Sequence, residues 1–265
     1  MHIKNNMKHF IKELLLESGE ILKKRFILKS EDQLRFKTPK DIVTTIDMEI
    51  EKIIINRINQ KCCDDIKIIS EEYNPTNIEF FLNEKCFIID PIDGTNNFIH
   101  NIPYFSISIA YSEKGKIITG GVYNPILDEM FLAEKGKGAY LNNKRIFVSK
   151  TNELINSLVA TGFACLRSNL KKNNLENVIR ILPVVRCLRR IGSAALDLCY
   201  TAAGRFDAFW ELNLNIWDIA AGVIIVEEAN GIVSDFNNTQ NYIFKKEILA
   251  SNGLIHSKIL ELLRN

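Results

Sequence analysis

The 265-residue sequence has few of the side chains that mark several common classes of protein. Only four histidines occur, at positions 2, 9, 100 and 256, and no two stand at the spacing of a zinc site. The six cysteines show neither metal-ligand spacing nor the framework of a small secreted domain. A histidine-based zinc enzyme is therefore not expected, and any metal should be held by carboxylates.

Long apolar runs and an excess of one charge are also missing. No run approaches the length of about 20 apolar residues that crosses a bilayer, and the opening MHIKNNMKHF lacks the apolar core of a signal peptide. The 34 Lys and Arg against 32 Asp and Glu give a net charge of +2, too little to indicate an obligate nucleic-acid partner. We therefore expect a cytoplasmic globular protein with reduced cysteines and neither membrane nor direct DNA binding.

Hydrophobic periodicity predicts a mixture of helices and strands along the whole chain. The predicted helices cover residues 7–26, 44–60, 193–203, 217–229 and 256–264. Strands are predicted at 66–69, 86–89 and 248–251, and hairpins at 105–124 and 129–141. No Pro- or Gly-rich linker separates the halves, so we expect a lobe junction near 143–155 between an N-terminal α+β lobe (1–145) and a C-terminal α/β lobe (146–265). This order of elements predicts sheets between layers of helices.

The densest group of polar residues is DPIDGTNNF, residues 90–98, which follows an apolar strand. Pro91 lacks the N–H needed to continue a ladder, so the chain is expected to turn there. Such a turn would bring Asp90, the carbonyl of Ile92 and Asp93 towards one point. Two carboxylates and a carbonyl form a hard, all-oxygen site that favours Mg²⁺. The alternative interpretation of the string is an ordinary capped turn.

Other residues gain meaning beside this string. Gly94 and Thr95 are expected to open a helix whose free N–H groups suit a phosphate. Glu71 follows a strand, so it is either part of a solvated turn or a ligand at the same sheet edge. Asp47 and Asp218 stand at predicted helix starts, where an aspartate is either an N-cap or part of a site.

Taken together, KDIVTTID, SEE, DPIDGTNNF, GSAALDL and WDIAAGVIIVEEANG occur in the order and at the approximate spacings of the inositol monophosphatase family. The sequence resembles that family over nearly its whole length, and the bacterial SuhB type most closely, through residues 189–211 and 231–236. The resemblance implies an α+β fold, the layered αβαβα sandwich of sugar phosphatases. It also implies hydrolysis of myo-inositol monophosphate to inositol and phosphate by metal-activated water, with no covalent phosphoenzyme.

The resemblance further implies two Mg²⁺ ions, or three. It assigns the first ion to Glu71, Asp90 and the Ile92 carbonyl, and the second to Asp90, Asp93 and Asp218, so that Asp90 bridges them. Glu71 also matches a ligand of a third, weakly held ion. One ion would lower the pKa of the attacking water and the other would neutralise the leaving alkoxide.

The remaining site residues are implied by the same resemblance. Thr95 and Asp47 match a pair that orients and deprotonates the attacking water, with Glu71 as a third catalytic position. The backbone N–H groups of Gly94 and Thr95 would hold the phosphate. The residues expected to contact the substrate are Asp93, Gly94, Thr95, Ala194 through its N–H, Glu211 and Asp218. Without the resemblance, Glu211 would be interpreted as a charged residue at a strand end.

The sequence departs from the family pattern in three places. Ser70 stands where a glycine commonly precedes the paired glutamates, Asn230 precedes Gly231 where Gly-Gly is common, and residues 237–240 read NNTQ where glycines are common. Asparagine tolerates left-handed backbone geometry, so the turn at Asn230 is expected to persist. None of these departures removes a ligand that the resemblance implies.

Two alternatives stay open. The same chemistry could serve another substrate, such as histidinol phosphate, fructose 1,6-bisphosphate or a 3′-phosphonucleotide. A SuhB-like protein could also bind the transcription antitermination machinery, contacting RNA polymerase and its Nus factors, with or without catalysis. The basic segment 180–190 carries four arginines, at 180, 186, 189 and 190, and is either a partner-binding surface or a solvated or homodimer-facing one.

Overall fold

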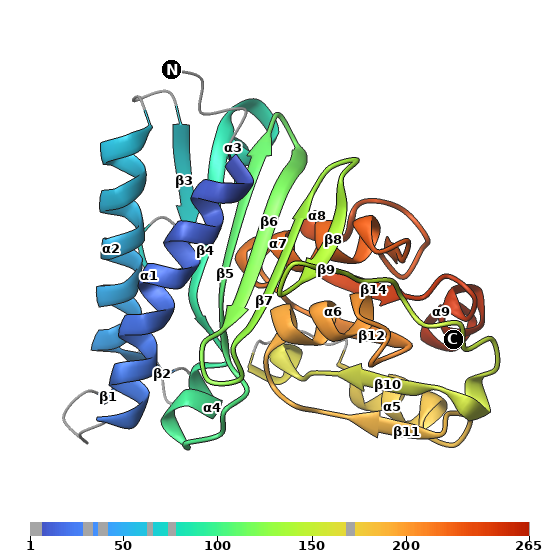
Figure 1. Ribbon diagram of the computed structural model, residues 1–265. Coiled ribbons are helices and arrows are strands. Elements are labelled where there is room, and N and C mark those ends of the chain that lie inside the picture. Colours follow the sequence, from blue (N-terminus) through green and yellow to red (C-terminus); the bar gives the residue numbers. More distant parts are fainter. Residues whose placement is uncertain are drawn as a thin grey trace.

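Two β-sheets, each lying between layers of helices, make up the structure (Figure 1). It is a computed structural model and describes residues 7–28, 34–36, 42–62, 66–73, 78–167 and 173–264. The larger sheet has seven strands in the order β3-β4-β5-β6-β7-β8-β9. These strands are β3 (Ile66–Ser70), β4 (Lys85–Asp93), β5 (Ser106–Glu113), β6 (Lys116–Asn124), β7 (Glu129–Glu134), β8 (Gly138–Leu141) and β9 (Lys144–Arg145). Only β3 and β4 pair in parallel within it.

The smaller sheet has five strands in the order β11-β10-β12-β14-β13. They are β10 (Leu158–Thr161), β11 (Cys187–Arg189), β12 (Ala208–Leu212), β13 (Ile232–Ser234) and β14 (Glu247–Ser251). A separate antiparallel pair joins β1 (Leu34–Phe36) to β2 (Ile42–Thr44). The short helices are α3 (Glu79–Asn83), α4 (Thr95–Ile99), α8 (Tyr242–Lys245) and the 3₁₀ turns η3 (Leu154–Asn156) and η4 (Ala164–Arg167).

The helices form three layers around these sheets (Figure 1). Helices α1 (Met7–Ile27) and α2 (Thr45–Lys61) cover the outer face of the larger sheet, and α6 (Ala194–Ala202) and α7 (Ile216–Glu228) lie between the sheets. The outer face of the smaller sheet is covered by α5 (Leu175–Ile181) and α9 (His256–Arg264). The layered αβαβα sandwich predicted from the sequence is therefore confirmed.

Alternation along the strands explains why the larger sheet can be covered on both faces. Phe87 and Ile89 of β4 belong to the core under α1 and α2, whereas Cys86 and Ile88 belong to the core around α6 and α7. Successive side chains of a strand point to opposite faces, so a continuous apolar run serves both cores. The predicted helices and hairpins lie within one or two residues of their observed bounds.

A glycine allows α7 to approach the larger sheet closely. A Cβ at Gly120 of β6 would lie 2.6 Å from a side-chain carbon of Ile224 and 2.9 Å from backbone atoms of Ala221. Since α7 carries Asp218 in its first turn, this contact helps to position a predicted site residue. Because α7 belongs to the second half yet packs on the first sheet, the division into lobes 1–145 and 146–265 stays a prediction.

The prediction that the chain turns at Pro91 is wrong. Strand β4 continues through Pro91 to Asp93, and its pairing with β5 shifts register on the way. Asp90 lies opposite Ser108 and Asp93 opposite Ser106. Two residues of β4 therefore lie between these pairs, but only one residue of β5. A bulge leaves its extra residue unpaired, which tolerates a proline inside the strand.

No helix in the described ranges is long and apolar enough to cross a membrane.

Candidate active site

A cleft of about 480 Å³ opens where the ends of β3 and β4 meet the first turns of α6 and α7 and strand β12. All but one of the predicted site residues line it. Those that do are Glu71, Asp90, Ile92, Asp93, Gly94, Thr95, Ala194, Glu211 and Asp218. The exception is Asp47, which is buried in the first turn of α2. The cleft therefore brings together residues as far apart in the chain as Glu71 and Asp218.

Parallel pairing of β3 and β4 places Glu71 beside Asp90. Ser70, the last residue of β3, lies opposite Ile89, so the residues that follow each of them reach the same edge of the sheet. The turn after β3 is held by the buried carboxylate of Glu51 on α2, which accepts the backbone N–H of Glu72 at 3.0 Å. Glu51 was not predicted from the sequence as a contributor to this site.

The end of β4 and the start of α4 are held by local hydrogen bonds. Asp90 Oδ1 accepts the backbone N–H of Ile92 at 3.0 Å, and the Thr95 hydroxyl donates to the Ile92 carbonyl at 3.0 Å. Gly94 has a φ of +97°, and a Cβ there would lie 3.1 Å from the Tyr104 carbonyl oxygen and 3.2 Å from that of Gly192. Only glycine suits this left-handed, crowded position. As predicted, a helix begins directly after it, at Thr95.

Asp93 is bound by the N-terminus of α6, which comes from the other half of the chain. Its Oδ2 atom accepts the Ser193 hydroxyl at 2.6 Å and the Ala195 N–H at 2.7 Å. Its Oδ1 atom accepts the Ala194 N–H at 3.3 Å. A helix N-terminus favours a negative charge, so α6 holds this carboxylate at the cleft. The Ala194 N–H, predicted to meet substrate, is thus already engaged by Asp93.

Asp218 combines a capping role with a place in the cleft. Of the two interpretations of Asp218, an N-cap or part of a site, the first does not hold, because the N-cap of α7 is Asn215 and Asp218 is the third helical residue. Its Oδ2 atom accepts the Asn215 N–H at 2.6 Å, as the third residue of a capping box does. Burial raises the pKa of Asp218 to about 7, and the charge of Asp93 adds to the effect.

Glu211 lies within β12 and is only 6% exposed, so it is not a surface charge at a strand end. Its Oε1 atom accepts the Ala164 N–H at 2.9 Å, and its carboxylate fills the space that a side chain at Gly162 would need. Burial raises the pKa of Glu211 to about 7. The Ala164 hydrogen bond and the charge of Arg190 oppose that rise, while Asp218 and Asp93 add to it.

The carboxylates of the cleft repel one another. Burial raises the pKa of Asp90 well above its usual range, and the charges of its neighbours, Glu71, Asp93, Asp218 and Asp47, raise it further. Burial also raises the pKa of Asp93 to about 6, against the lowering effect of its bonds to α6. Such a concentration of desolvated negative charge is stabilised by a cation.

A hard divalent cation fits this donor set. Its members are carboxylate oxygens and the carbonyl of Ile92, the ligands that Mg²⁺ prefers. Among the described residues, no three His, Cys, Asp or Glu side chains are gathered closely enough to enclose an ion as they lie. The carboxylates line the cleft, and a cation would offset the repulsion that separates them.

Several residues of the site were missed by the sequence reasoning. Asn97 of α4 donates to the carbonyls of Tyr104 at 2.6 Å and Ile191 at 2.9 Å, which ties α4 to the segment before α6. Ser193 could have been found, because a serine before an apolar helical run is an N-cap signal. Arg190 lines the cleft, but only a three-dimensional structure places it there.

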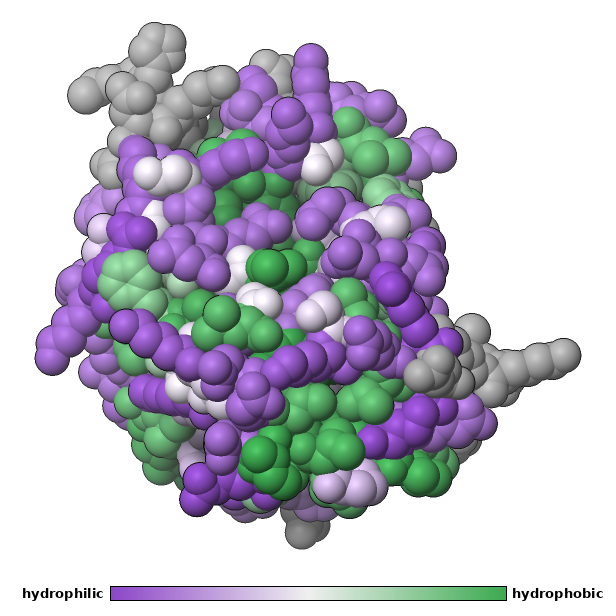
Figure 2. Space-filling model, turned by 90° about the vertical axis from the view of Figure 1, so that its right-hand side faces the viewer, coloured by the Kyte–Doolittle hydropathy of each residue, from purple (hydrophilic) through white to green (hydrophobic). Residues whose placement is uncertain are grey.

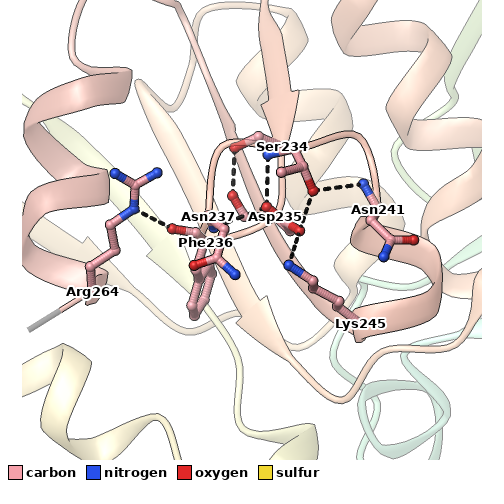
Figure 3. A network of polar contacts seen from close by, with 8 residues as sticks. Ser234, Asp235, Phe236, Asn237, Asn241, Lys245 and Arg264 are labelled. Atoms are coloured by element: carbon pink, nitrogen blue, oxygen red, sulfur yellow. Dashed lines mark hydrogen bonds and ion pairs between the residues drawn. The ribbon is translucent and has the colours of Figure 1, made fainter.

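The departures from the family pattern leave the nearby turns intact. Asn230 has a φ of +68°, the left-handed geometry that was predicted for it. The loop at residues 237–240 is organised by the carboxylate of Asp235 (Figure 3), which accepts the N–H groups of Asn237 at 2.9 Å and Thr239 at 2.8 Å. Lys245 adds an ion pair of 2.8 Å to the same carboxylate. The buried carboxylate of Asp235 therefore holds the turn at residues 237–240, where the family commonly has glycines.

Comparison with known proteins agrees with this fold and cleft. Residues 4–265 match the model of the inositol monophosphatase family. An inositol-1-monophosphatase of Mesorhizobium japonicum is 36% identical over 93% of this chain and 91% of its own length. A protein named Nus factor SuhB from Pasteurella multocida is 38% identical over 92% of this chain and 90% of its own length. A fructose-1,6-bisphosphatase/inositol-1-monophosphatase of Thermotoga maritima is 41% identical over 84% of this chain and 82% of its own length.

Solved structures give the same result. The crystal structure of the extragenic suppressor protein SuhB from Bartonella henselae superposes with a TM-score of 0.86 at 37% identity, covering 97% of this chain and 98% of that one. A layered sandwich with an acidic cleft at the meeting point of its sheets defines a sugar-phosphatase class of fold. The chain belongs to the inositol monophosphatase family. The family and the names of its relatives point to a phosphatase.

Proposed function

We propose that this protein is a Mg²⁺-dependent phosphomonoesterase that hydrolyses myo-inositol monophosphate to inositol and phosphate. One observation carries the proposal. Glu71, Asp90, Asp93 and Asp218, drawn from three parts of the chain, line one cleft beside the N–H groups that follow Gly94. Burial and the negative charges of the other three raise the pKa of Asp90, as expected of a site that holds cations.

A different set of cleft residues would bind each metal ion. Glu71, Asp90 and the Ile92 carbonyl would hold one ion, and Asp90, Asp93 and Asp218 a second, with a third held more weakly at Glu71. Mg²⁺ bound there would supply positive charge that favours ionisation of a water and neutralises the departing alkoxide. The bonds from α6 to Asp93 would fix the direction of that carboxylate before any ion binds.

Two other groups would act on the phosphate and the attacking water. Thr95 and Asp47 would orient the water and take its proton, so that its oxygen forms the new bond to phosphorus while the ester P–O bond breaks. Asp47 is buried within electrostatic reach of Asp90. The N–H groups of Gly94 and Thr95 would hold the phosphate oxygens, and the left-handed Gly94 leaves room for that approach.

On the alcohol side, Asp93 and Glu211 would accept hydrogen bonds from the hydroxyls of inositol, with Asp218 nearby. The Ala194 N–H would donate to one of these hydroxyls in place of its 3.3 Å bond to Asp93. Glu211 is supported by its position, since it faces the cleft and bonds the Ala164 N–H with one oxygen only. The other carboxylate oxygen can accept from a substrate hydroxyl.

The experiment is phosphate release from a panel of sugar phosphates, phosphonucleotides and p-nitrophenyl phosphate with Mg²⁺ present. The proposal expects turnover of myo-inositol monophosphate and its loss in the Asp90→Asn variant. Asp207→Asn is the matched control, because Asp207 bonds Ser149 and Leu158 outside the cleft. Absence of turnover on every phosphate in the wild type would refute the proposal.

A second candidate function is binding to the transcription antitermination machinery, through RNA polymerase or its Nus factors. It is supported by relatives that bear the name Nus factor SuhB. Exposed apolar side chains also lie on α5 and the turn after it, at Leu175, Ile179, Leu182 and Val184. Apolar residues gather among polar ones on the lower part of the face drawn in Figure 2. The same surface could serve a homodimer.

Sedimentation measures whether the surface around α5 forms a homodimer, and a pull-down measures whether it binds Nus factors. Ile179→Asp should weaken a homodimer or the capture of purified Nus factors if either partner covers α5, because it places a charge at the centre of an apolar contact. Ile155→Asp is the matched control, since Ile155 is 63% exposed but lies on η3. Equal behaviour of wild type and Ile179→Asp in both assays would remove α5 as a partner surface.

A further inference from the structure

A second cavity, of about 330 Å³, lies between α5, α9 and the loop that follows β13. Two arginines line it, Arg180 of α5 and Arg264 at the end of α9. None of the residues that line it also lines the active-site cleft, so the two cavities are separate.

Both arginines use part of the guanidinium for structure and keep further donors. Arg180 Nε donates to the Leu262 carbonyl at 2.7 Å, and one terminal nitrogen donates to Asn177 Oδ1 at 2.6 Å. Arg264 Nε donates to the Phe236 carbonyl at 2.6 Å, and its two terminal nitrogens make no contact with the other residues drawn in Figure 3. Since a guanidinium carries more N–H groups than these bonds use, donors on both side chains are available to a ligand.

The positive charge at this cavity is not neutralised by an acid. Glu176, in the first turn of α5, is the one carboxylate among the described residues that line the cavity. Neither Arg180 nor Arg264 forms an ion pair with Glu176 or with any other carboxylate in the part of the chain that the structure describes. An anion bound between the two guanidinium groups would offset both charges.

Buried polar side chains hold Arg180 in place. Asn177, which accepts its terminal nitrogen, is 2% exposed and donates to Asn174 Oδ1 at 3.1 Å. Asn174 is fully buried, and the same oxygen accepts Trp210 Nε1 of β12 at 2.7 Å. Arg180 is thus fixed to the core of the smaller sheet, so a ligand that binds it orders little that is not already ordered.

We propose that this cavity binds a phosphate group, as free phosphate or as the phosphate of a small monoester, at a site separate from the active-site cleft. A guanidinium presents paired N–H donors that match phosphate oxygens, and such charge-assisted bonds are stronger than neutral ones. The amides of Asn173 and Asn237 line the same cavity and can donate to further oxygens. A volume of about 330 Å³ suits a small ligand.

The test is calorimetric titration of inorganic phosphate into metal-free protein from which the chelator has been removed. Without metal, the carboxylates of the cleft repel phosphate, so the cavity at α5 and α9 is measured alone. The wild type should bind one phosphate per chain. Arg264→Ala should weaken this binding by about ten-fold or more, as expected for loss of a charged hydrogen bond. Arg264→Lys keeps the charge without the paired donors and should recover part of the loss.

Glu176→Gln gives a result of the opposite sign. It removes the one negative charge among the described lining residues and should tighten phosphate binding by roughly two-fold or more. Damage to the fold cannot produce such a gain. Arg186→Ala is the matched control for loss of positive charge, because Arg186 is exposed and lines neither cavity, and it should bind phosphate as the wild type does.

Two results would overturn the proposal. The first is no phosphate binding by the metal-free wild type in the millimolar range, or equal affinity in wild type, Arg264→Ala and Glu176→Gln. The second is loss of binding in Arg190→Ala but not in Arg264→Ala, because Arg190 lines the cleft and the phosphate would then lie there.

A second titration, with myo-inositol 1-phosphate, identifies the source of the phosphate group. Weaker binding of the monoester than of inorganic phosphate would identify free phosphate as the ligand, and tighter binding would identify a small phosphorylated molecule. Both titrations measure binding without metal or turnover, so they stand whether or not the protein hydrolyses phosphate esters.

Discussion

The hydroxyl of Ser193 lies 2.6 Å from Oδ2 of Asp93, which joins the N-cap of α6 to the last residue of β4 across 100 positions of sequence. This bond lowers the pKa of a carboxylate that burial raises. It also fixes the direction of a residue that would hold metal. Ser193 is therefore a positioning residue, and its effect can be measured.

Ser193→Ala should lower kcat/KM by about ten-fold or more, as expected for the loss of a hydrogen bond to a charged group. The dependence of rate on Mg²⁺ should move to higher concentration, because the freed carboxylate binds the ion less well. Ser193→Thr keeps the hydroxyl and should restore most of the rate. A purely structural serine would instead lower the melting temperature without moving the Mg²⁺ dependence.

Asp93→Asn should abolish turnover while leaving the fold intact. Loss of a metal-assisted step costs several kcal/mol of transition-state stabilisation, roughly a thousand-fold or more in rate. The variant keeps an oxygen that can accept the α6 bonds, so circular dichroism and the melting temperature should stay near those of the wild type. Retention of half the wild-type activity would rule out the assigned role.

Glu211→Gln separates recognition of the alcohol from the chemistry of the phosphate. The variant should weaken hydrolysis of inositol monophosphate by about ten-fold or more, on the order of one charged hydrogen bond. A featureless monoester such as p-nitrophenyl phosphate should be affected much less. Equal losses in kcat/KM on both substrates would make Glu211 structural, and no loss on either would make inositol a poor candidate substrate.

His256, far from the cleft residues in sequence, gives a prediction about stability. Its ring nitrogens lie 2.9 Å from the Ser234 hydroxyl and 2.8 Å from the Ser251 hydroxyl, and burial lowers its pKa from 6.5 to about 4. The folded state therefore holds the neutral ring, and the unfolded chain binds more protons between these two values. The stability from this group is fully present above pH 6.5 and is lost as the pH falls towards 4.

Melting temperatures measured across that pH range check this prediction. The wild type should lose more stability than His256→Asn between pH 6.5 and pH 4, because the variant has no proton to take up at this position. The carboxylates titrate in both proteins, so the difference between the two curves isolates the histidine. Parallel curves would contradict the lowered pKa of His256.

Local patterns predicted the long elements well, and the reasons are physical. Apolar spacing in α1 and α2 and alternation in β5 and β6 follow from burial of one face or of both. The turn at Pro91 was predicted wrongly because a regular ladder was assumed, whereas a bulge accommodates the proline. At the start of α7 the N-cap is Asn215, and Asp218 belongs to the same capping box and also lines the cleft, so a local pattern could not decide between a cap and a site residue.

Contacts between distant segments were beyond the reach of these patterns. The bond from Asn97 to the Ile191 carbonyl spans 94 positions, and it is this contact that brings the segment of Arg190 to the cleft. No local signal distinguishes Arg190 from Arg189, although one faces the cleft and the other bonds its own strand. Likewise Glu51 has the helical spacing of a surface residue but is 3% exposed.

The central claim is that the carboxylates around Asp90 hold the Mg²⁺ on which phosphate hydrolysis depends. The direct measurement is phosphate release from myo-inositol monophosphate by chelator-stripped protein as Mg²⁺ is added back. The account predicts no turnover in excess chelator, recovery in roughly the millimolar range of Mg²⁺, and suppression by Ca²⁺, which prefers more ligands in looser geometry. Full turnover in excess chelator would contradict it.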